Sequence, residues 1–592
     1  MDQRIKVFDS VRKYKWYFVV GPLLKAFETV VDLIVPLIMK NILDYMVQGH
    51  SQDECLYYLF TRLALIISLC LLGFTFTMIC QYIASVAAQK VSNDVRIKLF
   101  NHITSFSVKD VESFPDGYLN TCLTTDTTYV QTGVLHFIRL VSRAPFLIIG
   151  ALIITFTFDW SIGLLFLATI PIICFIVFFV MRKSSKQYTI LQKELDELTS
   201  LTSDTITGNR VIRAFNREDY QKEMFQKESE YYAKLGRKVS FINAFINPLV
   251  YMVINVAIVL VVYISGMKID GVITTPGGNK LEATTVIALV NYLEQIFIAL
   301  IVITNLVNIF TRAGISSRRI NKIFAKKASI ANDGKKIVKE IEKGEPLYEF
   351  ENVTFAYEDE GNKTLTDINF TVNKGEKVGV IGGTGCGKST LAKCLLRMVD
   401  ATEGTVKYKG DKISDYDLPT LHNEVGMVYQ KSVLFKGTIK SNMLMVNKNL
   451  TDDEIIKALK DALAYEFVSN YSDTINHEVE EGGRNFSGGQ KQRISIARIL
   501  AKNPEVMIFD DSTSALDYLS DLTVRKNIET KYSDKTIFYI SQRVSTIRNC
   551  DKIIVMDHGQ VVGVGTHAAL LNSNLVYQEI YRSQTKEANW YE

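Results

Sequence analysis

Six long apolar segments in the first half of the chain constrain its fold more than any other feature. A bilayer core of about 30 Å is crossed by about 20 residues of α-helix, whose backbone hydrogen bonds are all internal. The segments lie at residues 16–47, 57–82, 134–157, 161–181, 243–267 and 284–310. The sequence therefore predicts a membrane α-helical domain with six long transmembrane helices over residues 1–320.

The second half of the chain has a different pattern. After about residue 315 the apolar residues occur in short runs of strand length, separated by charged and glycine-containing stretches. The mean hydropathy of +0.10 for the whole chain is therefore an average over two unlike halves. Residues 321–346 are rich in lysine and are predicted to form a linker, which is followed by a soluble α/β domain over residues 347–592.

The basic residues predict which side of the membrane each loop faces. Residues 182–240 contain twelve Lys and Arg, whereas the short loops near 49–56 and 158–160 contain none. Cytoplasmic loops carry the excess of Lys and Arg. We therefore expect a multi-pass cell-membrane protein with its N-terminus and its soluble domain in the cytoplasm.

Two classes of function are disfavoured by the composition. The net charge of +4 is modest and gives no reason to expect nucleic acid as a partner. The eight cysteines show no paired metal-ligand spacing, so we interpret them as reduced thiols and not as disulfides or zinc ligands.

The two long cytoplasmic loops, roughly 83–133 and 182–242, are charged, helix-friendly and poor in Pro and Gly. This pattern predicts that the transmembrane helices continue well past the membrane surface. The stretches FPDGY, starting at Phe114, and ITGNR, starting at Ile206, supply the residues for the turns.

The strongest motif in the chain is VGVIGGTGCGKST. A β-run leads into the pattern GxxxxGKS, which a helical segment follows. Glycines allow the backbone N–H groups to wrap a phosphate, and the helix adds its positive N-terminal end. The motif predicts nucleotide binding by Gly382, Gly383, Thr384, Gly385, Cys386, Gly387, Lys388, Ser389 and Thr390. In such a loop the lysine reaches the β- and γ-phosphates and the serine hydroxyl binds Mg²⁺.

Two further motifs complete the predicted site. Asp510 ends a second hydrophobic strand, where it would act on Mg²⁺ from the second coordination shell. The turn formed by Ser487, Gly488, Gly489 and Gln490 opens a helix and makes a second bed of N–H donors. Because one nucleotide does not need two such beds, we predict a head-to-tail pair of domains, with each ATP between one P-loop and the other chain's Ser-Gly-Gly turn.

The order of these motifs resembles that of a half-size ABC exporter, and the resemblance covers nearly the whole chain. It implies a P-loop NTPase domain with the antiparallel and helical subdomains of that family, and ATP and Mg²⁺ as ligands. By resemblance, Tyr357 stacks on adenine, and Gln430 contacts Mg²⁺ and the attacking water. Ser487 to Gln490 match the family signature, preceded by Phe486 where Leu is usual.

Two positions depart from the family pattern. The hydrolytic glutamate after the second acidic strand is replaced by Asp511, and the switch histidine is replaced by Gln542. Removing one methylene moves the carboxylate back by roughly 1.5 Å, and a displacement on the order of 1 Å can lower a rate about a hundredfold. Glutamine cannot carry the proton of an imidazole. We therefore expect ATP to bind this P-loop and turn over slowly or not at all.

An intact signature turn beside a degenerate site predicts a heterodimer. The partner would be a second ABC half-transporter with the catalytic glutamate and switch histidine intact. The alternative is a homodimer with two slow sites in which aspartate acts as the base.

Polar residues inside the predicted spans are candidates for substrate contact. Glu28 and Asp32 fall on one face of the first span, and Asn291, Glu294 and Asn305 form a stripe on the sixth. Charged groups inside a membrane either face a wet cavity or pair with one another. Both alternatives remain open, because Lys25, Arg139 and Arg143 lie in the first and third spans.

The resemblance favours export of amphipathic drugs or other hydrophobic small molecules from the bilayer by alternating access, driven by ATP. Export of a specific peptide or lipid is one alternative, and a regulatory ATP-gated membrane subunit that does not pump is another. The polar C-terminal residues QTKEANWYE, which begin at Gln584, are predicted to fray.

Overall fold

The computed structural model describes residues 6–48, 50–115, 117–270, 282–330, 332, 334, 336–357, 363–512 and 516–588. The chain divides into two compact units. The first comprises Met1–Thr104 and Asp116–Lys326, and the second comprises Ser105–Pro115 and Lys327–Glu592.

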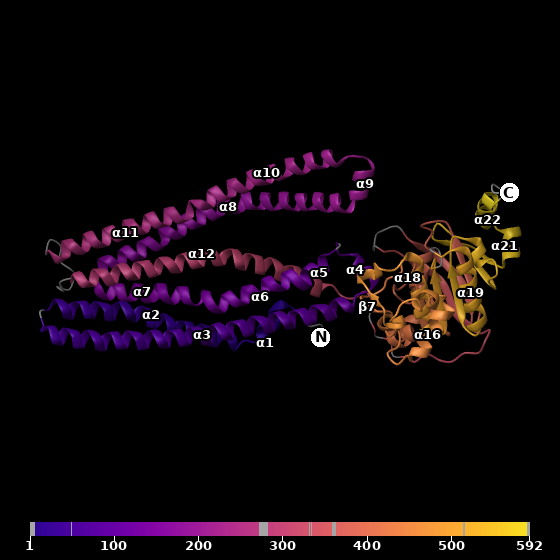
Figure 1. The fold of residues 1–592 in the computed structure, drawn as a ribbon, viewed down its shortest axis with the longest axis horizontal. Coiled ribbons are helices and arrows are strands. Elements are labelled where there is room, and N and C mark those ends of the chain that lie inside the picture. The colour runs from indigo at the N-terminus through magenta and orange to yellow at the C-terminus, as the bar shows by residue number, and fades with distance from the viewer. Residues whose placement is uncertain are drawn as a thin grey trace. The chain divides into compact units, whose positions relative to one another are not determined.

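The first unit is helical throughout its described residues (Figure 1). Its elements are α1 (Val7–Lys13), α2 (Tyr17–Val47), α3 (Gln52–Thr104), α5 (Tyr118–Thr121), the π-helix η1 (Cys122–Asp126), α6 (Thr127–His136), the π-helix η2 (Phe137–Val141), α7 (Arg143–Phe158), α8 (Trp160–Thr207), α9 (Asn209–Ala214), α10 (Glu218–Ala244), α11 (Ile246–Ile269) and α12 (Ala283–Ala325).

Each of the six predicted spans lies within a long helical segment. Among the described residues, five segments are long and apolar enough to cross a membrane, namely Gln52–Thr104, Tyr118–Phe158, Trp160–Thr207, Glu218–Ile269 and Ala283–Ile303. The first predicted span lies in α2, which contains Lys25, Glu28 and Asp32 and is not among these five. The crossing by α2 therefore stays a prediction.

The helices extend far beyond the length that a bilayer requires. The helix α3 has 53 residues and α8 has 48, against about 20 for one crossing. The sequence predicted these extensions. Their turns occur at the predicted stretches, where Gly117 has φ of 72° and Gly208 ends α8. A φ of this sign is open to glycine at little cost, because glycine has no Cβ.

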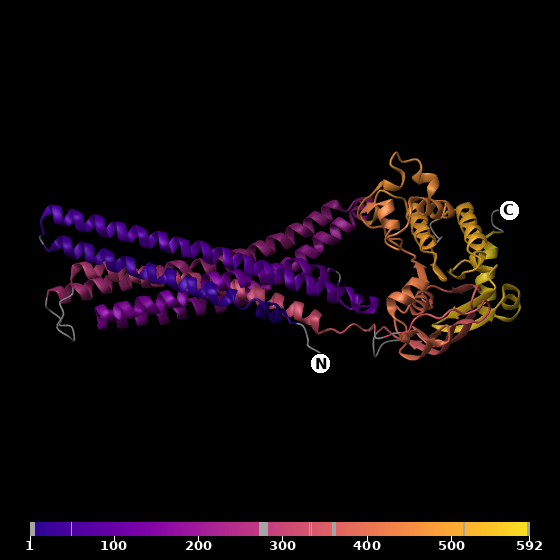
Figure 2. The ribbon, with the colours of Figure 1, turned by 90° about the horizontal axis from the view of Figure 1, so that it is seen from below.

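A helical hairpin of α8, α9 and α10 projects from the rest of the first unit. The helices α8 and α10 pack along each other, and both views show the hairpin separating from the other helices toward α9 (Figures 1 and 2). No residue of α9 is buried, and Val239 is the one buried residue of α10 in the described chain. The tip exposes Ile206, Val211 and Phe215.

The core of the first unit joins α7, α8, α11 and α12. Its buried side chains include Phe166, Ile254 and Tyr292. The Tyr292 hydroxyl donates a hydrogen bond to the carbonyl oxygen of Leu33 at 2.7 Å, which ties α12 to α2. This packing brings together helices that are far apart in the sequence.

The described residues of the second unit form three β-sheets and the remaining helices. Its strands are β1 (Pro346–Phe355), β2 (Leu365–Asn373), β3 (Lys377–Gly382), β4 (Glu403–Tyr408), β5 (Asp411–Lys412), β6 (Val425–Val428), β7 (Gly437–Thr438), β8 (Glu478–Val479), β9 (Val506–Asp510), β10 (Thr536–Ile540), β11 (Lys552–Asp557) and β12 (Gln560–Gly565). Its helices are α4 (Val108–Glu112), α13 (Lys388–Leu395), η3 (Ile413–Asp415), α14 (Leu418–Glu424), α15 (Ile439–Met443), α16 (Asp452–Asp461), α17 (Tyr465–Val468), η4 (Thr474–Asn476), η5 (Glu481–Gly483), α18 (Gly488–Lys502), α19 (Tyr518–Lys531), α20 (Val544–Ile547), α21 (His567–Ser573) and α22 (Leu575–Ala588).

The central sheet has the strand order β12-β11-β3-β10-β9-β6. The pairings from β11 to β6 are parallel, and β12 is antiparallel. A parallel sheet is covered on both faces, so its strands are continuous hydrophobic runs, as the fully buried strands β9 and β10 are. In such folds ligands bind at the carboxyl ends of the strands. This edge is where β3 leads into the glycine loop and β9 ends at Asp510.

An antiparallel sheet and a helical region flank the central sheet. The antiparallel sheet has the order β2-β1-β4-β5. In the helical region, α18 packs on α16. Phe486, which precedes the Ser-Gly-Gly turn, is buried against Phe467, Tyr471 and His477. The aromatic side chain at this position therefore anchors the turn to the helical region.

The short segment Ser105–Pro115 packs with the second unit, although it lies between two helices of the first. One oxygen of the Asp110 carboxylate accepts hydrogen bonds from the backbone N–H groups of Ser107 and Ser329, at 3.0 and 2.8 Å. These bonds hold the pKa of Asp110 below its usual range, although burial opposes them. Asp110 therefore joins α4 to the chain that follows α12.

Candidate nucleotide site

The glycine loop has the backbone geometry of a phosphate cradle. It connects β3 to α13, and Gly385 and Gly387 have φ of 80° and 98°. A Cβ on Gly387 would lie 2.8 Å from a side-chain carbon of Leu365 and 3.0 Å from the Thr364 carbonyl oxygen. Both the backbone conformation and the available space therefore require glycine at position 387.

The Lys388 ammonium lies on the loop itself. It donates hydrogen bonds to the carbonyl oxygens of Gly382 and Gly383, at 2.9 and 2.6 Å. Its position at the start of α13 gives a strongly hydrated point charge on a flexible stem. Because the lysine side chain is flexible, the same ammonium can leave these two carbonyl oxygens and bind a phosphate instead.

Asp510 lies at the end of β9 beside the glycine loop. Its side chain is buried, and burial raises its pKa, while a hydrogen bond from the Ser389 hydroxyl has the opposite effect. A carboxylate and a hydroxyl are oxygen donors of the type that Mg²⁺ prefers. The two predicted metal-site residues therefore lie at the carboxyl ends of β3 and β9, which are separated in the sheet by β10.

The two departures from the family pattern lie in the same pocket. Asp511 has a left-handed backbone with φ of 44°, and its N–H donates to the Ile540 carbonyl oxygen at 2.8 Å. The Gln430 amide donates to the Asp511 carboxylate at 3.4 Å. Gln542 follows β10 and also lines the pocket.

The pocket has a volume of about 320 Å³. Its lining combines the glycine loop with residues that the sequence placed in the site: Thr384, Gly385, Gly387, Lys388, Ser389, Thr390, Gln430, Asp510, Asp511 and Gln542. Thr364, Ile540 and Ser541 also line it, and sequence reasoning did not assign them to the site.

Tyr357 lies beside the helix that follows the glycine loop. Its hydroxyl is 3.5 Å from the Thr390 hydroxyl and accepts a hydrogen bond from Lys393 at 3.0 Å. The Lys393 ammonium also lies 3.6 Å from the carboxylate of Glu112 in α4. Neither Lys393 nor Glu112 belongs to a motif, so the sequence did not indicate this connection.

The signature turn is well formed but is not part of this pocket. Ser487 caps α18, its hydroxyl accepting from the Gln490 N–H at 3.3 Å, and the Gln490 side chain accepts from the Ser487 N–H at 2.9 Å. This reciprocal arrangement is a capping box. Among the described residues that line the nucleotide pocket, none comes from 487–490.

Comparisons with known proteins agree with this arrangement. Residues 18–306 match a family model described as the ABC transporter transmembrane region, and residues 365–514 match the ABC transporter model. An ATP-dependent lipid A-core flippase of Desulfotalea psychrophila is 32% identical over 502 residues, which cover 84% of this chain and 85% of the relative. The chain belongs to the ABC transporter family.

Two further relatives extend the comparison. A protein of Bacillus subtilis named for multidrug export is 29% identical over 581 residues, covering 98% of this chain and 99% of the relative. The solved structure of a bacterial Atm1-family ABC exporter with ATP bound has a TM-score of 0.81 and 21% identity, covering 97% and 98% of the two chains. That structure shows the shared fold.

These findings define a half-size ABC exporter, with an N-terminal transmembrane domain and a C-terminal ATP-binding domain. It is a multi-pass membrane protein and an ATP-hydrolysing transporter. The expected order of the two domains, and ATP as the expected nucleotide, are thereby confirmed.

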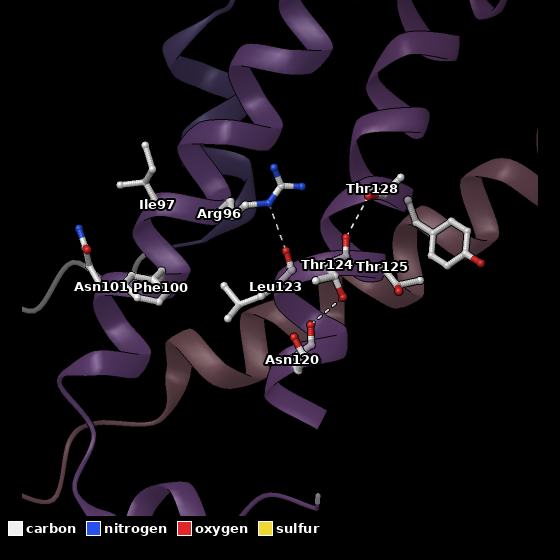
Figure 3. A pocket seen from close by; sticks show the side chains of 10 residues that line it. Arg96, Ile97, Phe100, Asn101, Asn120, Leu123, Thr124, Thr125 and Thr128 are labelled. Carbon is white, nitrogen blue, oxygen red and sulfur yellow. Dashed lines mark hydrogen bonds between the residues drawn. The ribbon is translucent and has the colours of Figure 1, made fainter. Parts of the chain in front are cut away.

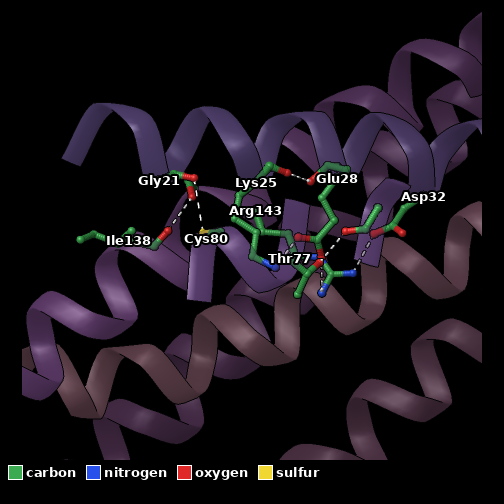
Figure 4. Close-up of polar contacts among 11 residues, drawn as sticks. Gly21, Lys25, Glu28, Asp32, Thr77, Cys80, Ile138 and Arg143 are labelled. Atoms are coloured by element: carbon green, nitrogen blue, oxygen red, sulfur yellow. Dashed lines mark hydrogen bonds and ion pairs between the residues drawn. The ribbon is translucent and has the colours of Figure 1, made fainter. Parts of the chain in front are cut away.

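The charged residues of the exporter's first predicted span form a paired network (Figure 4). Lys25 forms an ion pair with Glu28, and both side chains are buried. Arg143 of α7 lies 2.8 Å from Asp32 and 4.0 Å from Glu28. The predicted alternative of helix-to-helix pairing therefore describes Glu28 and Asp32 in this structure.

The polar stripe of α12 is less closely paired. The Asn291 amide donates to the Ile287 carbonyl oxygen of its own helix at 3.0 Å, and Glu294 is exposed. The side chain of Asn305 lies outside the described residues. Glu294 is thus the predicted acid in the spans that is open to contact from outside the chain.

A second cavity, with a volume of about 950 Å³, lies in the first unit between α3 and the segment from α5 to α6 (Figure 3). Arg96 crosses one side and donates to the Leu123 carbonyl oxygen at 3.2 Å. Ile97, Phe100 and three threonines also line it. The π-helix η1 forms part of its wall, and Asp126 at the end of η1 accepts from the Ser316 hydroxyl of α12 at 2.7 Å.

A buried ion pair that the sequence did not predict joins α8 to α11. The Lys268 ammonium lies 2.6 Å from the Asp159 carboxylate, and the two side chains are 2% and 1% exposed. Asp159 also caps α8 by accepting from the N–H groups of Ser161 and Ile162. One aspartate therefore accepts hydrogen bonds from the first N–H groups of α8 and also balances the charge of a buried lysine.

Proposed function

We propose that this chain is one half of a heterodimeric ATP-driven exporter and carries a degenerate nucleotide site. The observation that supports this most strongly is the separation of the two phosphate beds. The P-loop pocket contains no described residue of the signature turn, although both are well formed. An isolated chain has two half-sites, and a second chain placed head to tail completes both.

The exposed hairpin tip supports a second subunit. Val211 and Phe215 are 60% and 73% exposed, in a segment that the sequence predicts to be cytoplasmic. Large apolar side chains at an exposed tip are characteristic of a protein-protein contact. We propose that the tip docks on the nucleotide-binding domain of the partner, as expected for an exporter of this family.

Mg²⁺ fits the oxygen donors of this site. Ser389 and Gln430 would contact the ion, and Asp510 would act from the second coordination shell. Bound Mg²⁺ supplies charge neutralisation for the phosphates. The residues of this chain orient the nucleotide, with Tyr357 beside the base and Lys388 beside the terminal phosphates.

Slow hydrolysis follows from the two departures. The Asp511 carboxylate is one methylene shorter than glutamate, and its backbone is held by the bond to Ile540. Gln542 carries no titratable proton. We infer that this site holds ATP while the partner's site, completed by Ser487 to Gln490 of this chain, performs the hydrolysis.

Transport follows from differential binding. ATP drives a conformational change only if it binds one global state better than the other. Two nucleotides between the paired domains favour closure, and the helix extensions transmit it to an outward-opening cavity. Hydrolysis at the competent site then releases the closed state.

The slow-site proposal is tested by restoring the expected residues. We expect the purified wild-type chain to show little ATPase activity, and Asp511→Glu/Gln542→His to raise it by about tenfold to a hundredfold. Adding Lys388→Ala to the double variant should abolish the gain, because the phosphate contact is lost. Robust activity of the wild-type chain, equal to that of the double variant, would contradict both the slow site and the heterodimer.

The substrate that the comparisons support best is an amphipathic lipophile. One relative is named for multidrug export and another for lipid A-core flipping, so a drug and a lipid are both represented. The pairing of Glu28 and Asp32 gives no preference for cations. We propose amphipathic drugs as the first substrate class and a membrane lipid as the second.

Transport assays separate these classes. In inside-out vesicles we expect ATP-dependent uptake of an amphipathic dye, which a gated channel subunit would not show. A fluorescent lipid in proteoliposomes tests the flippase alternative. Glu294→Gln should alter dye transport if that exposed acid contacts the substrate, and unchanged transport would remove Glu294 from the substrate site. Glu28→Gln should mainly lower the stability of the protein, because Glu28 is paired within the structure.

A further inference from the structure

Gln584 of the C-terminal helix α22 is bonded to the loop that carries Gln542. Its side-chain amide nitrogen donates to the Gln542 carbonyl oxygen at 2.7 Å. Its amide oxygen accepts from the Val544 N–H at 2.8 Å. One side chain therefore satisfies a backbone acceptor and a backbone donor on the two sides of residue 543. Gln584 belongs to the tail that the sequence predicted to fray, and that prediction is wrong for the described part, because α22 continues to Ala588.

The remaining bonds of this loop are local or come from the neighbouring strand. The Ser541 N–H donates to the Val380 carbonyl oxygen at 3.0 Å, and the Arg543 N–H donates to the Ser541 hydroxyl at 3.0 Å. Between Gln542 and Val544, the two bonds to Gln584 are hydrogen bonds from another element. Val544 is buried, so leaving its N–H without a partner is costly, and the bond from this N–H to Gln584 constrains the loop. The bond to the Gln542 carbonyl oxygen lies at an exposed position.

The far end of the same segment is held independently. The Arg525 guanidinium of α19 donates to the carbonyl oxygens of Ser545 and Thr546, both at 3.1 Å. It is itself fixed by the buried Asp521 carboxylate at 2.7 Å. With α20 anchored at this end by Arg525, the freedom of the loop at its other end depends on Gln584.

The helix α22 is itself firmly attached to the domain. Tyr577 is fully buried, and its hydroxyl lies 2.7 Å from the His567 ring. The position of Gln584 therefore reports the position of a packed helix and not of a loose terminus.

We propose that Gln584 is a positioning residue for residues 541–543, here called the switch loop, and that α22 thereby regulates how long ATP stays at this chain's P-loop. Gln542 lines the nucleotide pocket. The position of its side chain in the pocket depends on the position of its backbone. A displacement of α22, by a partner or by binding to its exposed face, removes both bonds and frees the loop. This inference rests on the proposed slow nucleotide site.

Backbone hydrogen exchange tests the bonding without nucleotide. In the full-length protein, Gln584→Ala should accelerate exchange in the peptide that contains Val544, because that N–H loses its acceptor. The matched control is Thr585→Ala on the same helix, whose hydroxyl donates, within the described chain, to the Tyr581 carbonyl oxygen of α22. Gln584→Glu keeps the acceptor for Val544 but loses the donor to Gln542, so Val544 should stay protected.

Nucleotide release tests the regulation. We expect a fluorescent ATP analogue, chased with excess ATP, to leave Gln584→Ala and Gln584→Glu about threefold to tenfold faster than wild type, with Thr585→Ala unchanged. Equal release from all four proteins would overturn the proposal. If the wild-type chain binds no analogue, the proposed nucleotide function fails and the regulation fails with it, while hydrogen exchange still decides whether Gln584 holds the loop.

Discussion

At the scale of single residues, hydrogen bonds to backbone carbonyl oxygens fix the positions of polar residues in the nucleotide domain. Lys388 is bonded to two carbonyl oxygens of its own loop, and the N–H of Asp511 is bonded to Ile540. His422 follows the same rule, with its ring Nε2 lying 2.9 Å from the Leu396 carbonyl oxygen. A ring with a proton on Nε2 donates this bond.

The pKa of His422 predicts a stability change in mild acid. Burial lowers the pKa of His422 below its ordinary value of 6.5. As pH falls below about 6.5, the unfolded chain takes up a proton there and the folded chain does not, so the stability present at higher pH is lost toward the folded pKa. Calorimetry on detergent-solubilised protein should show a smaller drop in melting temperature between about pH 8 and pH 5.5 in His422→Gln.

The control for this prediction is His558→Gln, because the His558 side chain is 95% exposed. We expect its acid sensitivity to match that of wild type. An equal drop in melting temperature for His422→Gln and wild type would mean that the ring is protonated in the folded state.

At the scale of elements, ion pairs connect helices of the first unit that are distant in the sequence, and one of these pairs is buried. Asp159 and Lys268 join the start of α8 to the end of α11, and Arg143 joins α7 to α2 through Asp32. A buried charge left without its partner is costly, more so than an exposed one. Such pairs therefore determine which helices move as one body.

Breaking the Asp159–Lys268 pair should destabilise the membrane unit. Lys268→Met leaves the Asp159 carboxylate buried without a cation, which we expect to lower the free energy of unfolding by about 3–5 kcal/mol. Asp159→Asn/Lys268→Met should recover part of the loss, because asparagine also caps a helix. Denaturant titration of the protein in mild detergent measures the change.

Lys13→Met provides the comparison. Lys13 is 57% exposed and lies 2.9 Å from Asp94, so that pair should contribute at most about 1 kcal/mol. If Lys268→Met and Lys13→Met unfold at the same denaturant concentration, the buried pair does not stabilise the two helices.

At the scale of the whole molecule, we propose that one chain contributes parts of two nucleotide sites, which a second chain completes. The pocket at Lys388 has no residue of 487–490 among its described lining residues. The exposed hairpin tip likewise has no buried face in α9. An assembly of two chains is the arrangement that uses all three features.

Removing the apolar tip should therefore uncouple the assembly without unfolding the chain. We expect Val211→Ser/Phe215→Ser to lower ATPase activity of the assembled exporter by about tenfold or more, since a few buried apolar anchors dominate such interfaces. Its melting temperature should stay close to that of wild type, because both side chains are exposed in the single chain.

Ile337→Ser is the matched variant, since Ile337 is 80% exposed and lies outside the hairpin. It should retain full ATPase activity. The docking role of the tip is excluded if the hairpin variant and Ile337→Ser hydrolyse ATP equally fast in the assembled protein.

The long helices and the glycine loop could be predicted because local patterns specify them. An apolar run of about 20 residues has few alternatives in a membrane, and strand, glycine loop and helix follow one another directly between Val378 and Leu395. Asp510 was also predictable, because parallel strands end at one edge of a sheet. Asp511 and Gln542 could be placed at the same edge, because they follow the ends of β9 and β10.

The contacts of individual side chains between distant elements were decided by the tertiary structure alone. Glu28 could face a cavity or pair with a cation, and only the packing of α7 on α2 brings Arg143 to it. The Asp159–Lys268 pair and the bonds from Gln584 to the switch loop join residues 109 and about 40 positions apart, without a motif. Such contacts depend on how helices pack, which short-range periodicity does not specify. The sequence by itself thus determined the membrane helices and the nucleotide motif, and the fold decided which charges are paired and which loops are held.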